Sequence, residues 1–202
     1  MKKILLLAGA ACVLSANAFA IDLNPYVSAK AKYAFARNTI KVTGVNEGKA
    51  KFNDNVWGGS IAIGNTNPLI DGALRFELEY TKNADAEKRN VKVKTQAVLL
   101  NFYYDIDLKN NMPLTPYIGA GFGWGQSEFK FKHGHTKEDG VSMQIGAGVN
   151  YKICNNTSID FGYRYMTYGD FDKEYRVPGV TYEKFDYKPR AHELLLGVKY
   201  DF

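Results

Sequence analysis

The stretch RAHELLLGVKYDF, residues 190–202, alternates between two kinds of residue up to its last position. One set of alternate residues is almost wholly apolar: His192, Leu194, Leu196, Val198, Tyr200 and Phe202. The residues between them are mixed and charged. Alternation with a period of two indicates a β-strand with two unlike faces. Chain ends are usually frayed and polar, so a strand that ends on an aromatic ring needs a structural reason.

The same alternation recurs along the rest of the chain. It is found at residues 27–35, 57–64, 74–80, 96–106, 117–125, 141–151 and 158–168, and together with 190–202 it predicts eight strands. Short connections at 65–72, 107–115 and 154–158 alternate with longer polar ones at 38–54, 83–92, 127–140 and 169–188. An even number of strands joined in this way is typical of a bacterial outer-membrane barrel. We therefore predict an all-β protein, an eight-stranded antiparallel up-and-down transmembrane β-barrel.

The direction of the apolar face separates a membrane barrel from a soluble one. A soluble eight-stranded barrel of the lipocalin kind buries its apolar face in the lumen. Here the apolar set carries bulky aromatic residues near the strand ends, and the other set is rich in glycine and charge. A narrow lumen accommodates the glycine-rich set, so we expect the apolar set to face lipid, with its aromatic residues as interfacial girdles. An open sheet edge in lipid is costly, so the last strand should pair with the first.

The first twenty residues predict export. Two lysines precede the apolar run Ile4–Leu14, and Ala18 and Ala20 follow it. This is the pattern of a secretory signal peptide, and the run is too short to span a bilayer as a helix, which takes about 20 residues. A lipidated Cys12 is the alternative, disfavoured because Gly9 stands where a large apolar residue is expected. We predict a signal peptide at 1–20, removed on export, and a barrel domain at 21–202 in the bacterial outer membrane.

The inward face of the predicted barrel combines charges of both signs. Its members are Lys30, Lys32, Arg75, Glu77, Glu79, Asp105, Asp160, Arg164, Glu193, Lys199 and Asp201. The lumen of an eight-stranded barrel is only wide enough to be filled by side chains. An isolated charge there would pay a large desolvation cost. We therefore expect a network of ion pairs and no continuous water path.

Four stretches, TPYIGAGFGWG, MQIGAGVNYKI, SIDFGYRYMTYGDF and HELLLGVKYDF, resemble the second half of the opacity-protein family of small outer-membrane β-barrels. That family is related more loosely to OmpA-like transmembrane domains. The resemblance covers roughly residues 93–202. It implies an eight-stranded barrel, and it implies that Val198, Tyr200 and Phe202 form the recognition signal for the barrel-assembly machinery. It also implies a surface-antigen, adhesin or envelope-structure role without catalysis.

The four long connections are the predicted contact surface, because loops on a rigid scaffold carry most binding functions. Lys88, Arg89 and Lys92 would attract lipopolysaccharide phosphates or acidic host glycans. Tyr175, Tyr182 and Phe185 suit contact with a host protein. Merely solvated loops are the alternative. We expect outer-membrane lipids and lipopolysaccharide as surroundings, and a monomer or weak oligomer.

Other chemistries have weaker support. His133 and His135 lack further metal ligands nearby, so no metal or other cofactor is expected. His192 and Glu193 are neighbours on a strand and should point to opposite faces, which disfavours a catalytic pair. The net charge of +5 falls once Lys2 and Lys3 are removed, and the remainder is too small to indicate nucleic acid. Only Cys154 follows the signal peptide, so no intramolecular disulfide can form. A narrow channel for small solutes stays open as an alternative function, and a lipid-acting envelope enzyme is disfavoured.

Overall fold

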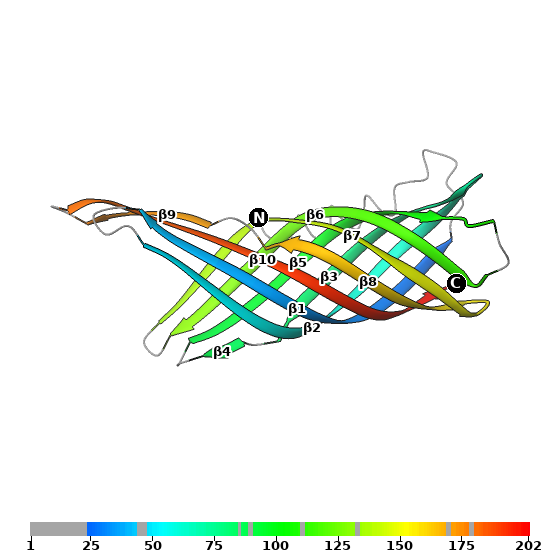
Figure 1. Ribbon diagram of the computed structural model, residues 1–202, viewed down its shortest axis with the longest axis horizontal. Coiled ribbons are helices and arrows are strands. Elements are labelled where there is room, and N and C mark those ends of the chain that lie inside the picture. Colours follow the sequence, from blue (N-terminus) through cyan, green and yellow to red (C-terminus); the bar gives the residue numbers. More distant parts are fainter. Residues whose placement is uncertain are drawn as a thin grey trace.

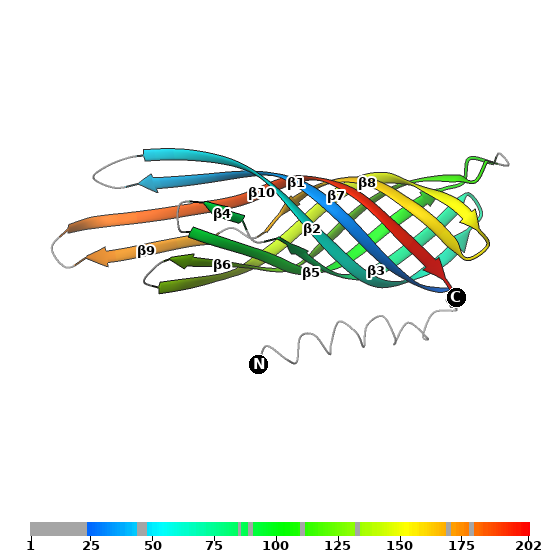
Figure 2. The same ribbon diagram turned by 90° about the horizontal axis from the view of Figure 1, so that it is seen from below.

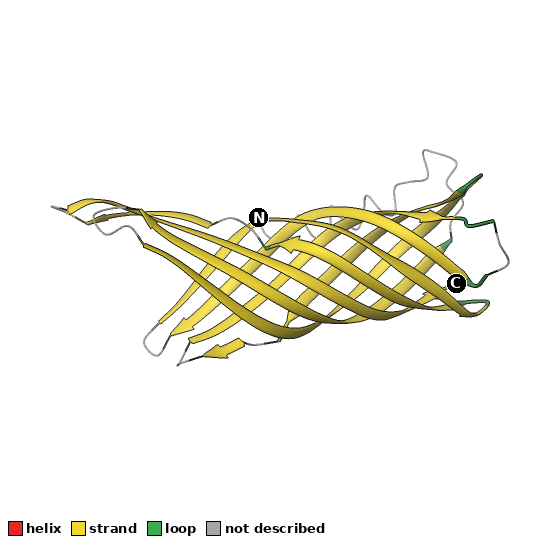
Figure 3. Cartoon of the chain, in the orientation of Figure 1, coloured by secondary structure: helices red, strands yellow, loops and turns green. Residues whose placement is uncertain are grey.

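The computed structural model describes residues 24–43, 48–84, 86–88, 91–109, 112–131, 134–168, 171–177 and 180–202. The predicted signal peptide at 1–20 lies outside these residues. Strands make up almost the whole described chain (Figure 3). They are β1 (Pro25–Thr43), β2 (Gly48–Leu69), β3 (Gly72–Asn83), β4 (Ala86–Lys88), β5 (Val91–Ile106), β6 (Leu114–Phe131), β7 (Gly134–Cys154), β8 (Thr157–Thr167), β9 (Phe171–Val177) and β10 (Val180–Asp201). In the described residues, no helix has the length and apolar character needed to cross a membrane.

The strands form a closed antiparallel barrel (Figure 1). The strands pair in the order β1, β2, β3, β5, β6, β7, β8 and β10, and β10 pairs with β1. The two short strands lie outside this order: β4 pairs with β5 and β9 pairs with β10. β4 follows β3 along β5, and β9 follows β8 along β10, each after a one-residue change in register. β4 and β9 are therefore outer continuations of β3 and β8, and the barrel itself has eight strands. The predicted fold class is confirmed.

The barrel closes where β1 meets β10. Their register runs without a break from Tyr26↔Asp201 to Thr43↔Lys184. The backbone N–H of Phe202 then donates to the carbonyl oxygen of Pro25 at 3.0 Å. Closure pairs the backbone groups that an open edge would leave exposed to lipid. This explains why the amphipathic stretch at 190–202 remains a paired strand to the end of the chain instead of fraying.

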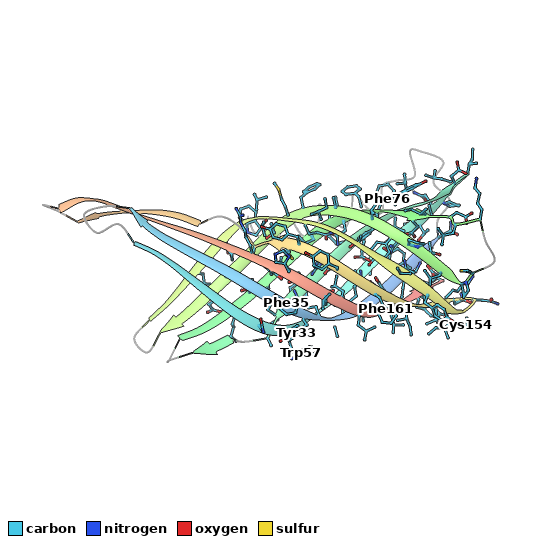
Figure 4. All side chains as sticks on the ribbon, viewed as in Figure 1. Tyr33, Phe35, Trp57, Phe76, Cys154 and Phe161 are labelled. Carbon is cyan, nitrogen blue, oxygen red and sulfur yellow. The ribbon has the colours of Figure 1, made fainter. Side chains whose placement is uncertain are left out.

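The outward face carries the apolar residues, as predicted. Trp57 is 65% exposed, Ile145 is 64% exposed and Leu196 is 52% exposed, although all three are large and apolar. Figure 4 shows Tyr33, Phe35 and Trp57 together on one side of the barrel wall, and Cys154 at the end with the short turns. The ring of Tyr33 lies 4.9 Å from that of Phe35 and 4.8 Å from that of Trp57, in edge-on contacts. This aromatic group matches an interfacial girdle.

The structure corrects the prediction of long polar loops. Residues 38–54 belong to β1 and β2 except for 44–47, and residues 127–140 belong to β6 and β7 except for 132–133. Residues 83–92 contain β4, and residues 169–188 contain β9 and the first part of β10. Beyond the membrane the apolar alternation stops because no lipid faces the strands, but backbone pairing continues. The pattern of side chains therefore ended before the strands did.

These outer extensions separate into two sheets. β2 leaves β3 after the pair Gly58↔Asn83, and β7 leaves β8 after Met143↔Thr167. We call β2, β1, β10 and β9 beyond these points the first arm, and β4, β5, β6 and β7 the second arm. Figures 1 and 2 show both arms projecting from the end of the barrel opposite to the C-terminus. The arms take the place of most of the four long polar connections that the sequence suggested.

Candidate functional site: the filled lumen and the outer arms

Because successive side chains of a strand point to opposite faces, the polar set of alternate residues in each strand lies in the lumen. In β3 the buried positions alternate with more exposed ones, and Arg75, Glu77 and Glu79 are 0–1% exposed. On β1 the buried positions include Lys30, which is 7% exposed, and Lys32, which is 1% exposed. The structure places all eleven predicted charged residues in ion pairs: Lys30, Lys32, Arg75, Glu77, Glu79, Asp105, Asp160, Arg164, Glu193, Lys199 and Asp201.

The cluster nearer the arms is centred on Arg164 of β8. Its guanidinium group lies 2.9 Å from a carboxylate oxygen of Glu79 and 2.7 Å from one of Glu193. Glu193 also lies 3.2 Å from the Lys32 ammonium group and accepts a short hydrogen bond from the Tyr168 hydroxyl. Thr81 accepts from Lys32 at 2.6 Å and from Arg164 at 3.2 Å. Four barrel strands, β1, β3, β8 and β10, are thereby joined through the lumen.

The cluster nearer the short turns is centred on Lys30. Its ammonium group lies 3.5 Å from Glu77 and 3.3 Å from Asp160. The Tyr26 hydroxyl donates to Glu77 at 3.0 Å, and the Tyr117 hydroxyl donates to Asp160 at 2.7 Å. Each buried carboxylate therefore has both a cation and a hydroxyl partner, which offsets its loss of hydration.

Arg75 closes this cluster toward the short turns. Its guanidinium group lies 2.7 Å from Asp105 and 4.8 Å from the ring centroids of both Tyr103 and Tyr117. Contact of a cation with two ring faces is favourable and fills space. Tyr26, Tyr117 and Tyr168 were missed as lumen residues by the sequence interpretation, although parity with Ser28, Gly119 and Met166 places them on the inward face. At the rim, the buried Lys199 pairs at 2.9 Å with Asp201, whose side chain is 35% exposed.

Amide side chains connect the two clusters. The Asn101 side chain donates to Glu79 at 2.7 Å and to Glu77 at 3.3 Å, and Gln144 donates to Asn101 at 3.1 Å. Charged and amide groups thus follow one another along the barrel axis. Such a lumen is suited to holding the wall together, since its charged groups contact one another, although among the described residues Nη2 of Arg75 and the hydroxyl groups of Ser127 and Ser142 are buried without a hydrogen-bond partner.

His192 and Glu193 point to opposite faces of β10. Nδ1 of His192 lies 2.6 Å from the Tyr163 hydroxyl on the outer wall, whereas Glu193 is buried inside. The two side chains cannot act on one substrate. Within the part of the chain that the structure describes, no group of three or more His, Cys, Asp or Glu residues could hold a metal ion. His133 lies outside the described residues, as does the side chain of His135.

The predicted contact residues all belong to the arms. Lys88 lies in β4, Lys92 in β5, Tyr175 in β9, and Tyr182 and Phe185 in β10. Their backbones are placed, but their side chains lie outside the described residues, as does the whole of Arg89. The predicted assembly signal lies on the outer wall: Val198 is 51% exposed, Tyr200 45% and Phe202 72%. The rings of Tyr200 and Phe202 meet edge-on at 5.3 Å.

Comparisons with known proteins agree with this architecture. The model of the outer membrane protein beta-barrel domain family matches residues 4–202. Outer membrane protein PagN of Salmonella typhimurium is 25% identical over 239 residues, which cover 92% of this chain and 99% of that protein.

Solved structures give the same result. Neisserial surface protein A superposes with a TM-score of 0.60 at 24% identity, covering 88% of this chain and 97% of that one. Ail, the attachment invasion locus protein of Yersinia pestis, superposes with a TM-score of 0.51 at 16% identity, covering 89% and 100%. Ail has also been solved with the heparin analogue sucrose octasulfate. These likenesses establish the barrel fold and bear out the resemblance to small outer-membrane barrels.

Proposed function

Because the chain belongs to the outer membrane protein beta-barrel domain family, it is a bacterial outer-membrane protein, and we propose that its arms are a contact surface for molecules outside the cell. The observation that carries this proposal is the contrast between lumen and arms. Buried ion pairs fill the lumen, whereas two four-stranded arms project beyond the barrel wall. The wall faces lipid and the turns at the other end are short, so the arms are the surface that an extracellular partner meets.

The nature of the partner follows from the charge of the arms. The second arm contains Lys88 in β4 and Lys92 and Lys94 in β5, and Arg89 stands between them in the sequence. Clustered basic residues attract lipopolysaccharide phosphates and acidic host glycans. The name of Ail as an attachment protein, and its complex with a heparin analogue, support a polyanion as one class of partner. The first arm, with Tyr175, Tyr182 and Phe185, suits a host protein.

We propose in addition that the chain acts without catalysis and that it functions as a monomer or weak oligomer. Val198, Tyr200 and Phe202 are read by the barrel-assembly machinery, in keeping with their exposed outward positions at the rim. A narrow channel for small solutes is the alternative function, and planar-bilayer recording of pure refolded protein separates it from the contact role. Large, stable single-channel currents from the intact protein would favour the channel function over the contact function.

Attachment is tested by grafting. The hairpins at 83–92 and 169–188 are transferred separately onto an inert eight-stranded barrel, and attachment of the bacteria to host cells is measured at increasing salt. The graft of 83–92 should raise attachment at low salt and lose that effect at high salt, because exposed charges are screened within about 8 Å at physiological ionic strength. The graft of 169–188 should be less sensitive to salt. If neither graft raises attachment and the intact protein shows none, a purely structural envelope role is the better account.

A further inference from the structure

The outer part of β2 has an open edge. From Gly48 to Val56, β1 is the one strand among the described residues that pairs with β2, since β3 pairs with β2 only from Gly58 inward. The last contact on that side is the hydrogen bond from the Ala84 N–H to the Trp57 carbonyl oxygen, at 2.7 Å. In an antiparallel ladder, the N–H and C=O of one residue point to the same neighbour, and successive residues alternate. Lys49, Lys51, Asn53 and Asn55 therefore direct their backbone groups to the open edge.

This edge keeps its capacity to pair. No proline interrupts residues 48–57, so every amide donor is present. An extended edge of this kind is a template for a further strand, unless short length, bulges, charged side chains or covering segments protect it. Lys49 and Lys51 oppose the addition of a basic strand but not of an acidic one. The pairing of β2 with β1 continues in register from Pro25↔Asn65 to Val42↔Gly48 without a bulge.

The register also gives the edge a charge preference. Lys41 of β1 stands directly opposite Lys49 of β2, and Lys51 is two positions along the same strand on the same face. Like charges directly opposite one another are destabilising, and an opposite charge on the next strand relieves that repulsion. The acidic residue of this stretch, Asp54, has the other parity and belongs to the other face.

We propose that the edge of β2 between Gly48 and Val56 binds an extended polypeptide segment with acidic residues at alternate positions, which adds as a further strand. Backbone hydrogen bonds to Lys49, Lys51, Asn53 and Asn55 provide the pairing, and the lysines of this face select the acidic partner. This inference deepens the proposed contact role of the arms and rests on it. A proteinaceous partner is distinguished here from an acidic glycan, which offers no backbone amides for pairing.

The test uses the full barrel refolded in detergent micelles and a fluorescent peptide of alternating Glu and Val. A length of about ten residues lets the peptide lie along Gly48–Val56. The second probe is the same peptide with N-methyl groups on alternate amides, which keeps the charge and removes the donors. Fluorescence anisotropy should show binding of the first peptide and a Kd weakened about tenfold or more for the second. Equal binding of the two peptides would overturn the proposal.

Variants of the protein test whether the backbone donors of the β2 edge are needed for peptide binding. Asn53→Pro removes one edge donor, whereas its matched control Asn53→Ala keeps it. Asn53→Pro should weaken peptide binding by about threefold to tenfold, as expected for one lost hydrogen bond, and Asn53→Ala by less than about twofold. The combined Lys49→Glu and Lys51→Glu variant should lose the preference for the acidic peptide. Retention of the folded gel mobility shows that each variant has formed its barrel.

Failure of this inference is distinguishable from failure of the contact role. If the hairpin grafts raise attachment, but Asn53→Pro and Asn53→Ala bind the peptide equally, the arms bind by charge alone and the edge site is wrong. If the peptide binds in the edge-dependent way but neither the grafts nor the intact protein attach to cells, the edge site stands and the host-attachment role is wrong.

Discussion

Lys32 on β1 and Glu193 on β10 form an ion pair of 3.2 Å across the junction at which the barrel closes. Both side chains are fully buried. Glu193 is held in addition by Arg164 of β8, so the closing strand is fixed from both sides through the lumen. Backbone pairing on the wall and ion pairing inside therefore stabilise the same junction.

Arg164→Met should lower the free energy of unfolding by about 3–5 kcal/mol, because it leaves the buried carboxylate of Glu79 without its cation. Urea titration of the protein refolded into lipid vesicles measures the change. Lys109→Gln is the control, since its pair with Asp71 is exposed to solvent and should be worth about 1 kcal/mol or less. Equal losses for the two variants would contradict a stabilising lumen network.

Leu196→Lys should destabilise the barrel by about 2–4 kcal/mol, the cost of a lysine facing lipid near the bilayer midplane. Leu69 provides a control of matched exposure, 50% against 52% for Leu196, at the end of β2 beside the short turn. Leu69→Lys should cost about 0–1 kcal/mol because it lies near the interface. The same vesicle titration compares them, and similar losses would show that the bilayer is not centred on Leu196.

Gly119→Ala should lower stability by about 1–3 kcal/mol through overpacking of the lumen. A Cβ atom at this position would overlap the ring of Tyr103, which stacks on Arg75. Gly59→Ala is the control, because the nearest atom to its Cβ would be the Lys30 carbonyl oxygen at 3.3 Å. Thermal unfolding in detergent should separate the two variants, and a tolerated Gly119→Ala would show that the lumen has free space.

Deletion of Phe202 should reduce the amount of protein in the outer membrane and leave unassembled chain in the periplasm. The ring of Phe202 lies exposed on the outer wall, in the position expected of an assembly signal. Phe202→Tyr keeps the aromatic ring and should assemble normally. Fractionation of cells followed by immunoblotting measures both. Normal outer-membrane levels of the deletion variant would refute the role of this residue in assembly.

Cys154 should report the orientation of the barrel. It is exposed at the end with the short turns, and a hydrogen bond with Thr157 lowers the pKa of its thiol, which favours the reactive thiolate at neutral pH. A membrane-impermeant maleimide should therefore label Cys154 only after the cells are opened. In a Cys154→Ser background, Ala86→Cys in β4 should be labelled on intact cells. The reverse result would place the arms in the periplasm.

The sequence predicted the membrane-spanning part of the fold because lipid imposes a rule on every second residue. Leu196 and Leu195 are adjacent and chemically identical, yet parity alone assigned the first to lipid and the second to the lumen, as the structure has them. The charged lumen residues were found in the same way. Parity gives the face of a residue but not its partner, so the sequence could not assign Arg164 to Glu79, which is 85 positions away.

The arms and the lumen tyrosines were not predicted from this alternation. Outside the bilayer both faces of a strand meet water, so residues such as Lys49 and Lys51 carry no apolar alternation, and the arms were taken for loops. The lumen tyrosines were overlooked for a different reason. The predicted lumen network contained charged residues alone, whereas the hydroxyl groups of Tyr26 and Tyr117 donate to buried carboxylates inside the barrel.

The junction between β1 and β10 also imposes an order in time. A ribbon of the preceding strands has two open edges and an interior in which Lys32 still lacks Glu193, so neither lipid nor the lumen favours it. Both deficits are removed in one event, the arrival of β10. Insertion should therefore be abrupt, without a stable half-closed state.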